Sequence, residues 1–284
     1  MTVTTRKISS GLQSNSDTEL KSGKVIRGPR PRSIKLLSQL GVFVLILGIW
    51  QIAAMSGQLG AVPTPLIVGG AVLSLIVDGS VWSPLAETLI SWFVSLVLAV
   101  VIGVFLGFPL GISKVAYRLS VFTLDFLRTI PALVFVPLVV LLYGSGIEST
   151  ILLAFVGAVW AMIMQTIYGA RDLEPVARDT FRSFKVRRWD TVRHLLIPTA
   201  LPYIATGIRL AAAICLLISI SAQIVIPAGG FGEQIVASQL GGAIAQMFAY
   251  IFLCGVLGVG IDAAFAYFER RVLAWHPSHR KVLS

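Results

Sequence analysis

The chain has 284 residues, of which 56% are hydrophobic and only 13% are charged, whereas soluble domains carry about 25% charged residues. Its apolar residues form runs of about 20, the length that crosses a bilayer, which excludes an ordinary soluble domain. The net charge of +10 does not indicate nucleic-acid binding, because the basic residues stand between apolar runs without interleaved aromatic residues. The composition therefore predicts an all-α integral membrane protein embedded in the lipid bilayer.

Residues 1–35 are polar and rich in Ser, Gly, Pro and basic residues. Such a segment buries too little apolar surface to fold, so we expect a disordered basic cytoplasmic tail. The tail is too long for the charged region of a signal peptide, and further apolar runs follow it. The first span is therefore expected to be retained.

Six apolar runs are long enough to span the bilayer. They are expected at Leu36–Met55, Leu85–Ile112, Ser120–Tyr143, Thr150–Ala170, Pro198–Ile226 and Ala243–Tyr267. Between the first two, Leu66–Val77 is apolar but too short to cross, which predicts a re-entrant or surface helix. The six-helix transmembrane domain is expected to occupy residues 36–277, followed by a cytoplasmic tail at 278–284.

The orientation follows from the basic residues. All Lys and Arg residues except Arg128 and Arg209, which fall within spans, lie in the two tails and in the second-to-third and fourth-to-fifth loops. The other three loops contain none. Cytoplasmic loops carry the excess of Lys and Arg in membrane proteins, so both termini are predicted to be cytoplasmic (N-in, C-in).

Gly103, Gly107 and Gly111 form a tandem GxxxG pattern, which lets the backbones of two membrane helices approach closely. Cys215 and Cys254 both lie inside apolar runs and have no partner at the spacing of metal ligands. They are expected to be small buried apolar side chains.

Residues for catalysis are missing from the sequence. It contains no G-x-x-x-x-G-K-[ST] loop for nucleotide phosphates. Its histidines, His194, His276 and His279, lie at the cytoplasmic margin without acids at ligand spacing. We therefore expect no catalytic residues, no metal and no cofactor, and a protein that is not an enzyme.

Charged side chains inside spans are costly and are usually functional or paired. Asp125 and Arg128 stand three residues apart and so share one helix face, which fits either an internal salt bridge or a role in a solute path. Arg209 and Asp262, on the fifth and sixth spans, are expected to face the bundle and to pair. The spans lack the series of carboxylates typical of proton-driven carriers, which counts against a secondary transporter.

The cytoplasmic loop at 171–197 mixes charged residues with apolar ones at helical spacing. This pattern favours a docking surface for a soluble partner. The alternative is a helix held at the membrane surface by anionic lipid.

At this loop the chain resembles the permease subunits of binding-protein-dependent ABC importers of the nitrate/sulfonate/taurine type. Leu195, Ile197 and Pro198 match the end of that family's E-A-A…G…I-x-L-P signature. Counting back from Pro198 places Lys185 at the glycine and Asp179-Thr180-Phe181 at E-A-A. Further similar segments are L-R-T-I-P at 127–131, A-L-P at 200–202 and G-G-F-G at 229–232.

The resemblance implies a type I ABC importer permease in the bacterial plasma (inner) membrane. Its partners would be a cytoplasmic ABC ATPase dimer, an extracytoplasmic solute-binding protein and a second permease copy, with a homodimer favoured over a heterodimer. The implied ATPase-coupling residues are Asp179, Thr180, Phe181, Arg182, Ser183, Phe184, Lys185, Val186 and Pro198. The candidates for the translocation path are Arg128, Pro131, Arg209 and Gln223.

Two departures from the family pattern stand out. Glycine in the signature permits a tight turn, and Lys185 resists a positive φ angle. Gln223 stands where the family commonly has glutamate. These departures fit a working but divergent importer, one half of a heterodimer or a poorly coupled paralogue. We favour the first: an importer that passes a small solute, such as a sulfonate, nitrate or organic acid, driven by a separate ATPase. Arg128 and Arg209 are candidate contacts for that anion. An ATP-independent channel or carrier is the alternative.

Overall fold

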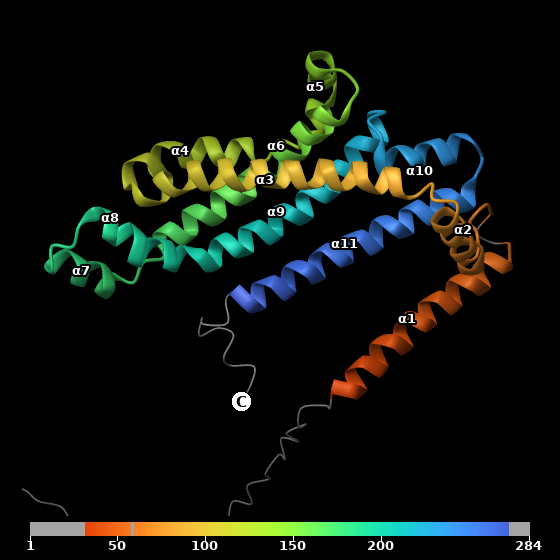
Figure 1. Ribbon diagram of the computed structural model, residues 1–284, viewed down its shortest axis with the longest axis horizontal. Helices are drawn as coiled ribbons and strands as arrows, with labels where there is room; N and C mark the ends of the chain where they lie inside the picture. The colour runs from red at the N-terminus through yellow and green to blue at the C-terminus, as the bar shows by residue number, and fades with distance from the viewer. Residues whose placement is uncertain (1–31, 58–59, 273–284) are drawn as a thin grey trace, which may run out of the picture. The chain divides into compact units, whose positions relative to one another are not determined.

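The computed structural model describes residues 32–57 and 60–272, and every regular element among them is helical (Figure 1). The elements are α1 (Arg32–Met55), α2 (Pro65–Val77), α3 (Trp82–Ile112), α4 (Lys114–Leu127), η1 (Ala132–Phe135), α5 (Val136–Tyr143), α6 (Ile147–Arg171), α7 (Pro175–Ser183), α8 (Arg188–Thr191), η2 (Val192–Leu196), α9 (Ile197–Val225), α10 (Gly230–Leu240) and α11 (Ile244–Val272). The all-α prediction is confirmed.

Four helices are long and apolar enough to cross a membrane: α3, α6, α9 and α11. They agree with the second, fourth, fifth and sixth predicted spans. The first predicted span lies within α1, in which the described apolar stretch is the shorter Val44–Met55. The total of six spans and the N-in, C-in orientation therefore stay predictions. The two tails lie outside the described residues, except for residues 32–35, which begin α1 instead of belonging to a disordered segment.

The third predicted span, Ser120–Tyr143, is wrong as a single helix. The chain ends α4 at Leu127, and the helical pair Ala132–Tyr143 continues at an angle of 75° to it. Pro131 causes the break, because proline has no N–H to donate and disfavours the helical conformation of the residue before it. The amides of Thr129 and Ile130 instead donate to the carbonyls of Phe126 and Leu127, at 3.1 and 3.3 Å, in tight final turns.

The short helix predicted between the first two long spans is present as α2. Thr64 caps it by accepting a hydrogen bond from the amide of Ile67, and Pro65 occupies the first turn, where a missing N–H costs nothing. The helix packs against α11, and its Leu75 joins a buried cluster with Phe231 and Tyr250. In Figure 1, α2 and α10 lie together at one end of the bundle that α3, α6, α9 and α11 form, and α7 and α8 lie at the other.

Helices α3 and α6 pack closely together, and the predicted glycine pattern allows this contact. A Cβ atom on Gly103, Gly107 or Gly111 would lie 2.6–2.7 Å from the side chains of Met162, Thr166 or Ala170, well inside contact distance. Glycine at these positions lets the two backbones meet, as the tandem GxxxG indicates. Helix α9 packs against both α6 and α3, and its Cys215 is a fully buried free thiol, as expected. Cys254 on α11 is also a free thiol but is only partly buried, contrary to the expectation.

We expect Gly107→Ala to lower the free energy of unfolding by about 1–3 kcal/mol, because the added methyl group must push α3 away from α6. The measurement is the thermal unfolding midpoint in detergent, followed by size-exclusion chromatography. Gly260→Ala on α11 is the matched control, since nothing lies within 4 Å of a Cβ placed there. Equal midpoints for the two variants would contradict the close contact.

Candidate functional site

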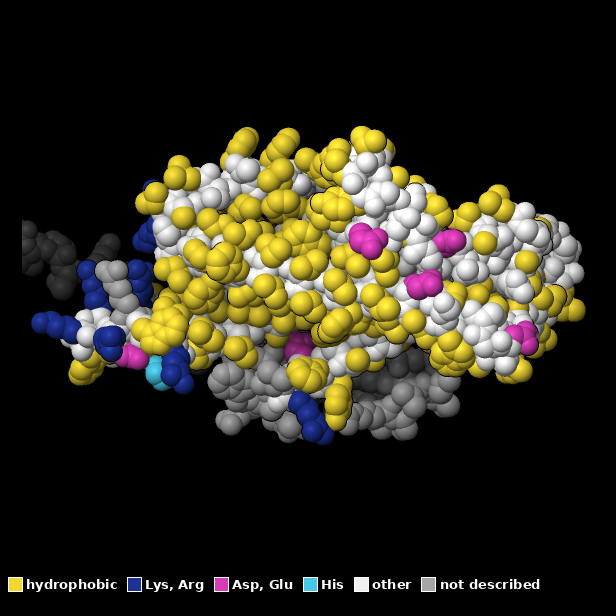
Figure 2. All heavy atoms as spheres, turned by 45° about the horizontal axis from the view of Figure 1, so that its top comes forward, with side chains coloured by type: hydrophobic (Ala, Val, Ile, Leu, Met, Phe, Trp, Pro, Cys, Tyr) yellow, Lys and Arg dark blue, Asp and Glu magenta, His cyan; other side chains and the backbone are white. Residues whose placement is uncertain are grey.

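The two ends of the bundle differ in charge. Figure 2 shows Lys and Arg side chains gathered at the end formed by α7 and α8, while an apolar surface covers the middle of the visible face. Lys114, Arg171 and Arg178 come from three different elements and line one cavity at this end. The described loops predicted to be cytoplasmic therefore meet at one end of the bundle.

The predicted coupling segment forms a helix and a turn. α7 ends at Ser183, and the amide of Lys185 donates to the carbonyl of Arg182 while the amide of Val186 donates to the carbonyl of Phe181, both at 3.1 Å. This pair of bonds is the Schellman motif, which requires a left-handed residue after the helix cap. Lys185 is that residue, with φ of 50°, and is the one non-glycine residue of positive φ in the described chain.

The left-handed backbone at position 185 explains why the family signature has glycine there. A left-handed conformation costs an L-residue about 1–2 kcal/mol, and glycine avoids the cost. Lys185 adopts the glycine conformation, so the turn is kept although its usual residue is missing. From the sequence, Lys185 is expected to resist a positive φ angle. The turn forms nevertheless, with Lys185 at φ of 50°.

The turn presents apolar side chains to the outside. Phe184 is 79% exposed and Val176 is 69% exposed, on a segment that also carries Arg178 and Arg182. Both exposed apolar side chains therefore lie on a segment that is otherwise polar and basic. Within the described residues nothing covers these two side chains.

Pro198 lies at the start of α9, directly after the π-helical turn η2. A proline ring inside an α-helix collides with the carbonyl four residues earlier, here that of His194. The wider π-helical turn accommodates the ring. The chain therefore passes from α8 through η2 into the long span α9 without an intervening loop.

Arg128 and Pro131 lie at the break between α4 and η1. Arg128 pairs with Asp125 at 3.1 Å, and both side chains are about half exposed (49% and 47%). The predicted pairing of these two residues is confirmed. Pro131 is exposed as well, so the break presents both path candidates on an open face of the bundle.

Arg209 sits between two carboxylates that connect α9 to α11. Its Nε and Nη2 donate to the two oxygens of Asp262 at 2.8 and 3.0 Å, and Nη1 lies 3.6 Å from Glu269. The predicted pairing of Arg209 with Asp262 is confirmed. Because two acids already surround this guanidinium, the arrangement favours a bridge between helices over a free anion contact. The role of Arg209 in a solute path stays a prediction.

Gln223 lies at the opposite end from the coupling segment and is 1% exposed. It belongs to a set of side chains that receives every amide from Gly229 to Gly232, at the start of α10. The amide of Gly229 donates to Glu233 at 2.5 Å and that of Gly230 to Glu87 at 2.6 Å. The amide of Phe231 donates to Thr88 at 2.9 Å and that of Gly232 to Gln223 at 3.3 Å. We call this set the α10 clasp.

The α10 clasp satisfies the donors that a helix leaves unpaired at its N-terminus. It also ties α10 to α3 through Glu87 and Thr88, and Thr88 donates in turn to Gln223 at 3.2 Å. The side-chain amide nitrogen of Gln223 has no partner in the described chain. Sequence reasoning missed Glu87 and Thr88. The available signal was the G-G-F-G segment, whose exposed amides need acceptors.

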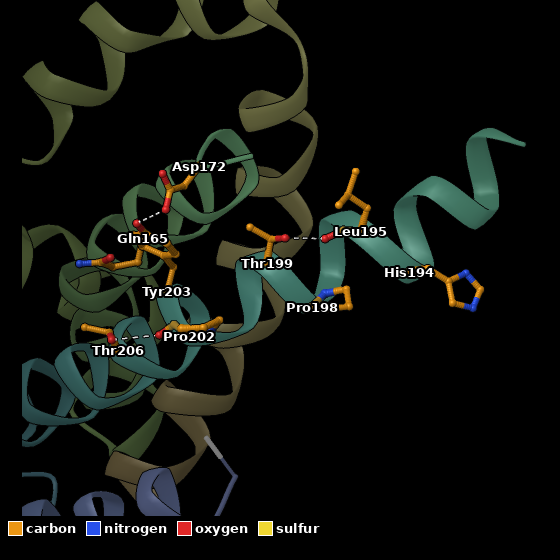
Figure 3. A pocket seen from close by; sticks show the side chains of 9 residues that line it. All are labelled: Gln165, Asp172, His194, Leu195, Pro198, Thr199, Pro202, Tyr203 and Thr206. Carbon is orange, nitrogen blue, oxygen red and sulfur yellow. Dashed lines mark hydrogen bonds between the residues drawn. The ribbon is translucent and has the colours of Figure 1, made fainter. Parts of the chain in front are cut away.

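A cavity of about 560 Å³ opens between the ends of α6 and α9 near the coupling segment. Figure 3 shows Asp172 and Tyr203 pointing toward one another, with Gln165 beside them and His194 at the far edge, directed away. The hydroxyl of Tyr203 donates to Asp172 at 2.5 Å. The described residues contain no group of His, Cys, Asp and Glu able to hold a metal ion.

Comparisons with known proteins match this arrangement. Residues 99–274 match the family model described as binding-protein-dependent transport system inner membrane component. The chain is 27% identical over 237 residues to a putative aliphatic sulfonates transport permease protein, SsuC, of Bacillus subtilis, covering 83% of this chain and 86% of the relative. It is 26% identical over 261 residues to the nitrate import permease protein NrtB of Leptolyngbya laminosa, covering 88% and 90%. The taurine transport system permease protein TauC of Escherichia coli is 23% identical, covering 88% and 93%.

Solved structures show the same fold. Inward-facing MetNI methionine ABC transporter aligns with a TM-score of 0.59 and 22% identity, covering 66% of this chain and 93% of that chain. An amino acid ABC transporter crystallised with histidines aligns with a TM-score of 0.59 and 16% identity, covering 70% and 97%.

We expect Gln223→Glu to destabilise the protein, because a third carboxylate would enter the α10 clasp beside Glu87 and Glu233. Adding Glu87→Gln should restore stability, with a coupling of about 1–3 kcal/mol in a double-mutant cycle. Thermal unfolding of the four proteins in detergent measures it. Additive effects of the two changes would contradict a shared site at Gly230 and Gly232.

Proposed function

This chain belongs to the family of binding-protein-dependent transport system inner membrane components, and we propose that it forms the path by which a small anion enters the cytoplasm. It is a multi-pass plasma-membrane permease of an ABC importer of the nitrate/sulfonate/taurine type. The proposal extends this to a solute with a compact oxyanion group, such as a sulfonate, nitrate or organic acid. Energy would come from a separate ATPase dimer.

The exposed apolar side chain of Phe184, on the turn at the end of α7, supports contact of this segment with the ATPase. Phe184 projects from a turn whose left-handed residue, Lys185, is fixed by two backbone hydrogen bonds. A rigid turn with an exposed aromatic side chain is a suitable knob for a groove on a soluble partner, because little conformational freedom is lost on binding. We assign Asp179–Val186 to contact with the ATPase.

In this mechanism the turn transmits a rigid-body movement. Closure of the ATPase dimer around ATP would displace the coupling segment, and the continuous path from α8 through η2 into α9 would tilt α9. Since α9 packs on α6, and α6 on α3, the bundle would move as one body against a second permease copy. The solute path would then open alternately to either side, with an extracytoplasmic binding protein delivering the solute.

The break at Arg128–Pro131 supports a path along α4 and η1. Irregular backbone at membrane depth is tolerated only where it is buried in protein or lines a water-filled cavity, and broken helices form solute sites in many transporters. Arg128 is the basic side chain at this break, and its guanidinium matches the planar oxygens of nitrate or sulfonate. We therefore place the anion contact at Arg128 ahead of Arg209.

We expect Phe184→Ala to abolish the binding of the ATPase, and with it ATP-driven uptake, because the turn loses the side chain that docks. The variant should still fold normally. The test purifies the tagged chain from native membranes in mild detergent and measures the ATPase activity that co-purifies. Trp189→Ala is the control, since Trp189 is 71% exposed but lies outside the coupling turn. If the wild-type chain purifies without ATPase activity and still passes solute, it is an ATP-independent channel or carrier.

We expect Arg128→Ala to reduce uptake about tenfold or more, the worth of a hydrogen bond to a charged group. The measurement is uptake of taurine, nitrate and an alkanesulfonate into proteoliposomes containing the whole importer. Asp125→Asn separates two roles: an anion contact predicts retained uptake, whereas a structural ion pair predicts the same loss as in Arg128→Ala. Arg118→Ala, on the same helix, controls for lost positive charge.

A further inference from the structure

A second cavity, distinct from the path candidates, lies where the ends of α3 and α6 meet the coupling segment. Its volume is about 210 Å³, room for a polyatomic anion with several waters, each of which takes about 30 Å³ in the liquid. Three basic side chains line it: Lys114 at the start of α4, Arg171 at the end of α6 and Arg178 on α7. We call it the basic cavity.

The charges of the basic cavity are not neutralised by the described chain. Among the described residues, none of these three side chains has a carboxylate oxygen within 4.0 Å, whereas Arg128 and Arg209 both do. Arg171 stacks its guanidinium 3.9 Å from the centre of the Tyr117 ring, a contact that fixes the side chain and leaves its charge unmatched. The three side chains are exposed and line one cavity with like charge, so an anion bound there would reduce their mutual repulsion.

The remaining lining is suited to the edge of a membrane. Ile112, Leu173, Leu195 and Leu196 complete the wall, and Ile112 is 48% exposed. The apolar side would accept a glycerol backbone or acyl chain while the basic side holds a charged group. Basic pockets between membrane helices on the cytoplasmic side bind anionic headgroups in this way.

We propose that the basic cavity binds a phosphate group, supplied by the headgroup of an anionic phospholipid or by free inorganic phosphate. Such a ligand would bridge the ends of α4 and α6 to the coupling helix α7 through Arg178. It would fix the orientation of α7 relative to the bundle and thereby favour the arrangement that docks a partner. This consequence for coupling rests on the proposed function, whereas the binding itself does not.

A purely structural role gives a different expectation. Lys114 and Arg171 lie where α3 and α6 end, and basic side chains there interact favourably with the unpaired carbonyl groups at the ends of helices. In that case their replacement lowers stability equally in all lipids. A binding site makes the effect of the same replacement depend on the anionic headgroup.

The test measures binding to the full-length permease directly. The delipidated protein is incubated with phosphatidylglycerol or phosphatidylcholine, and native mass spectrometry counts retained lipid for wild type, Lys114→Gln/Arg178→Gln and Arg118→Gln. Arg118 is an exposed basic residue one helical turn beyond Lys114 and does not line the cavity. Unfolding midpoints in phosphatidylcholine verify that the variants fold.

We expect the double variant to retain less phosphatidylglycerol by about fivefold for each removed charge, while Arg118→Gln behaves as wild type. Selective loss identifies a lipid headgroup. If no lipid is retained but inorganic phosphate raises the unfolding midpoint of wild type and not of the double variant, at matched ionic strength in chloride, free phosphate is the ligand. Equal behaviour of the double variant and Arg118→Gln in both assays would overturn the proposal, whatever the outcome for transport.

Discussion

The close contact of α3 with α6 is the constraint on which the rest of the bundle depends. In lipid there is little hydrophobic gain from pressing two apolar helices together, so their association relies on packing and on close backbone approach. Gly103, Gly107 and Gly111 remove the side chains that would keep the backbones apart. Because α9 packs against both α3 and α6, this contact helps to set the positions of three spans and of the segments at both of their ends.

At one end of the bundle the contact leads to the α10 clasp. α3 reaches this end with Glu87 and Thr88, and α9 reaches it with Gln223, so the helices that pack in the middle also deliver the acceptors for the start of α10. Thr88 and Gln223 are buried and Glu87 is partly buried, and an unpaired buried amide would cost about 1–3 kcal/mol. The position of α10 is therefore a consequence of how α3 and α9 pack on α6.

The sequence predicted the elements better than it predicted their contacts. The apolar runs located α3, α6, α9 and α11, because the length of a span is a local property of the sequence. The glycine spacing likewise indicated close packing of α3. The prediction of one helix over Ser120–Tyr143 was wrong, because apolar composition does not report that Pro131 interrupts the helix. The clasp was not predictable, because Thr88 and Phe231 are 143 positions apart and only the fold brings them together. The turn at Lys185 could be located only through the family signature, since lysine itself does not indicate a left-handed residue.

The end of α6 separates two cavities of opposite character. Arg171 and Asp172 are consecutive, yet Arg171 lines the basic cavity and Asp172 lines the cavity of Figure 3. The helix ends between them, so the two side chains leave the backbone in different directions, and Tyr117 and Tyr203 hold one each. An anion near α9 would meet the carboxylate of Asp172, whereas an anion near α7 would meet three cations. If the proposed phosphate site exists, it would therefore lie beside α7 and away from the carboxylate of Asp172.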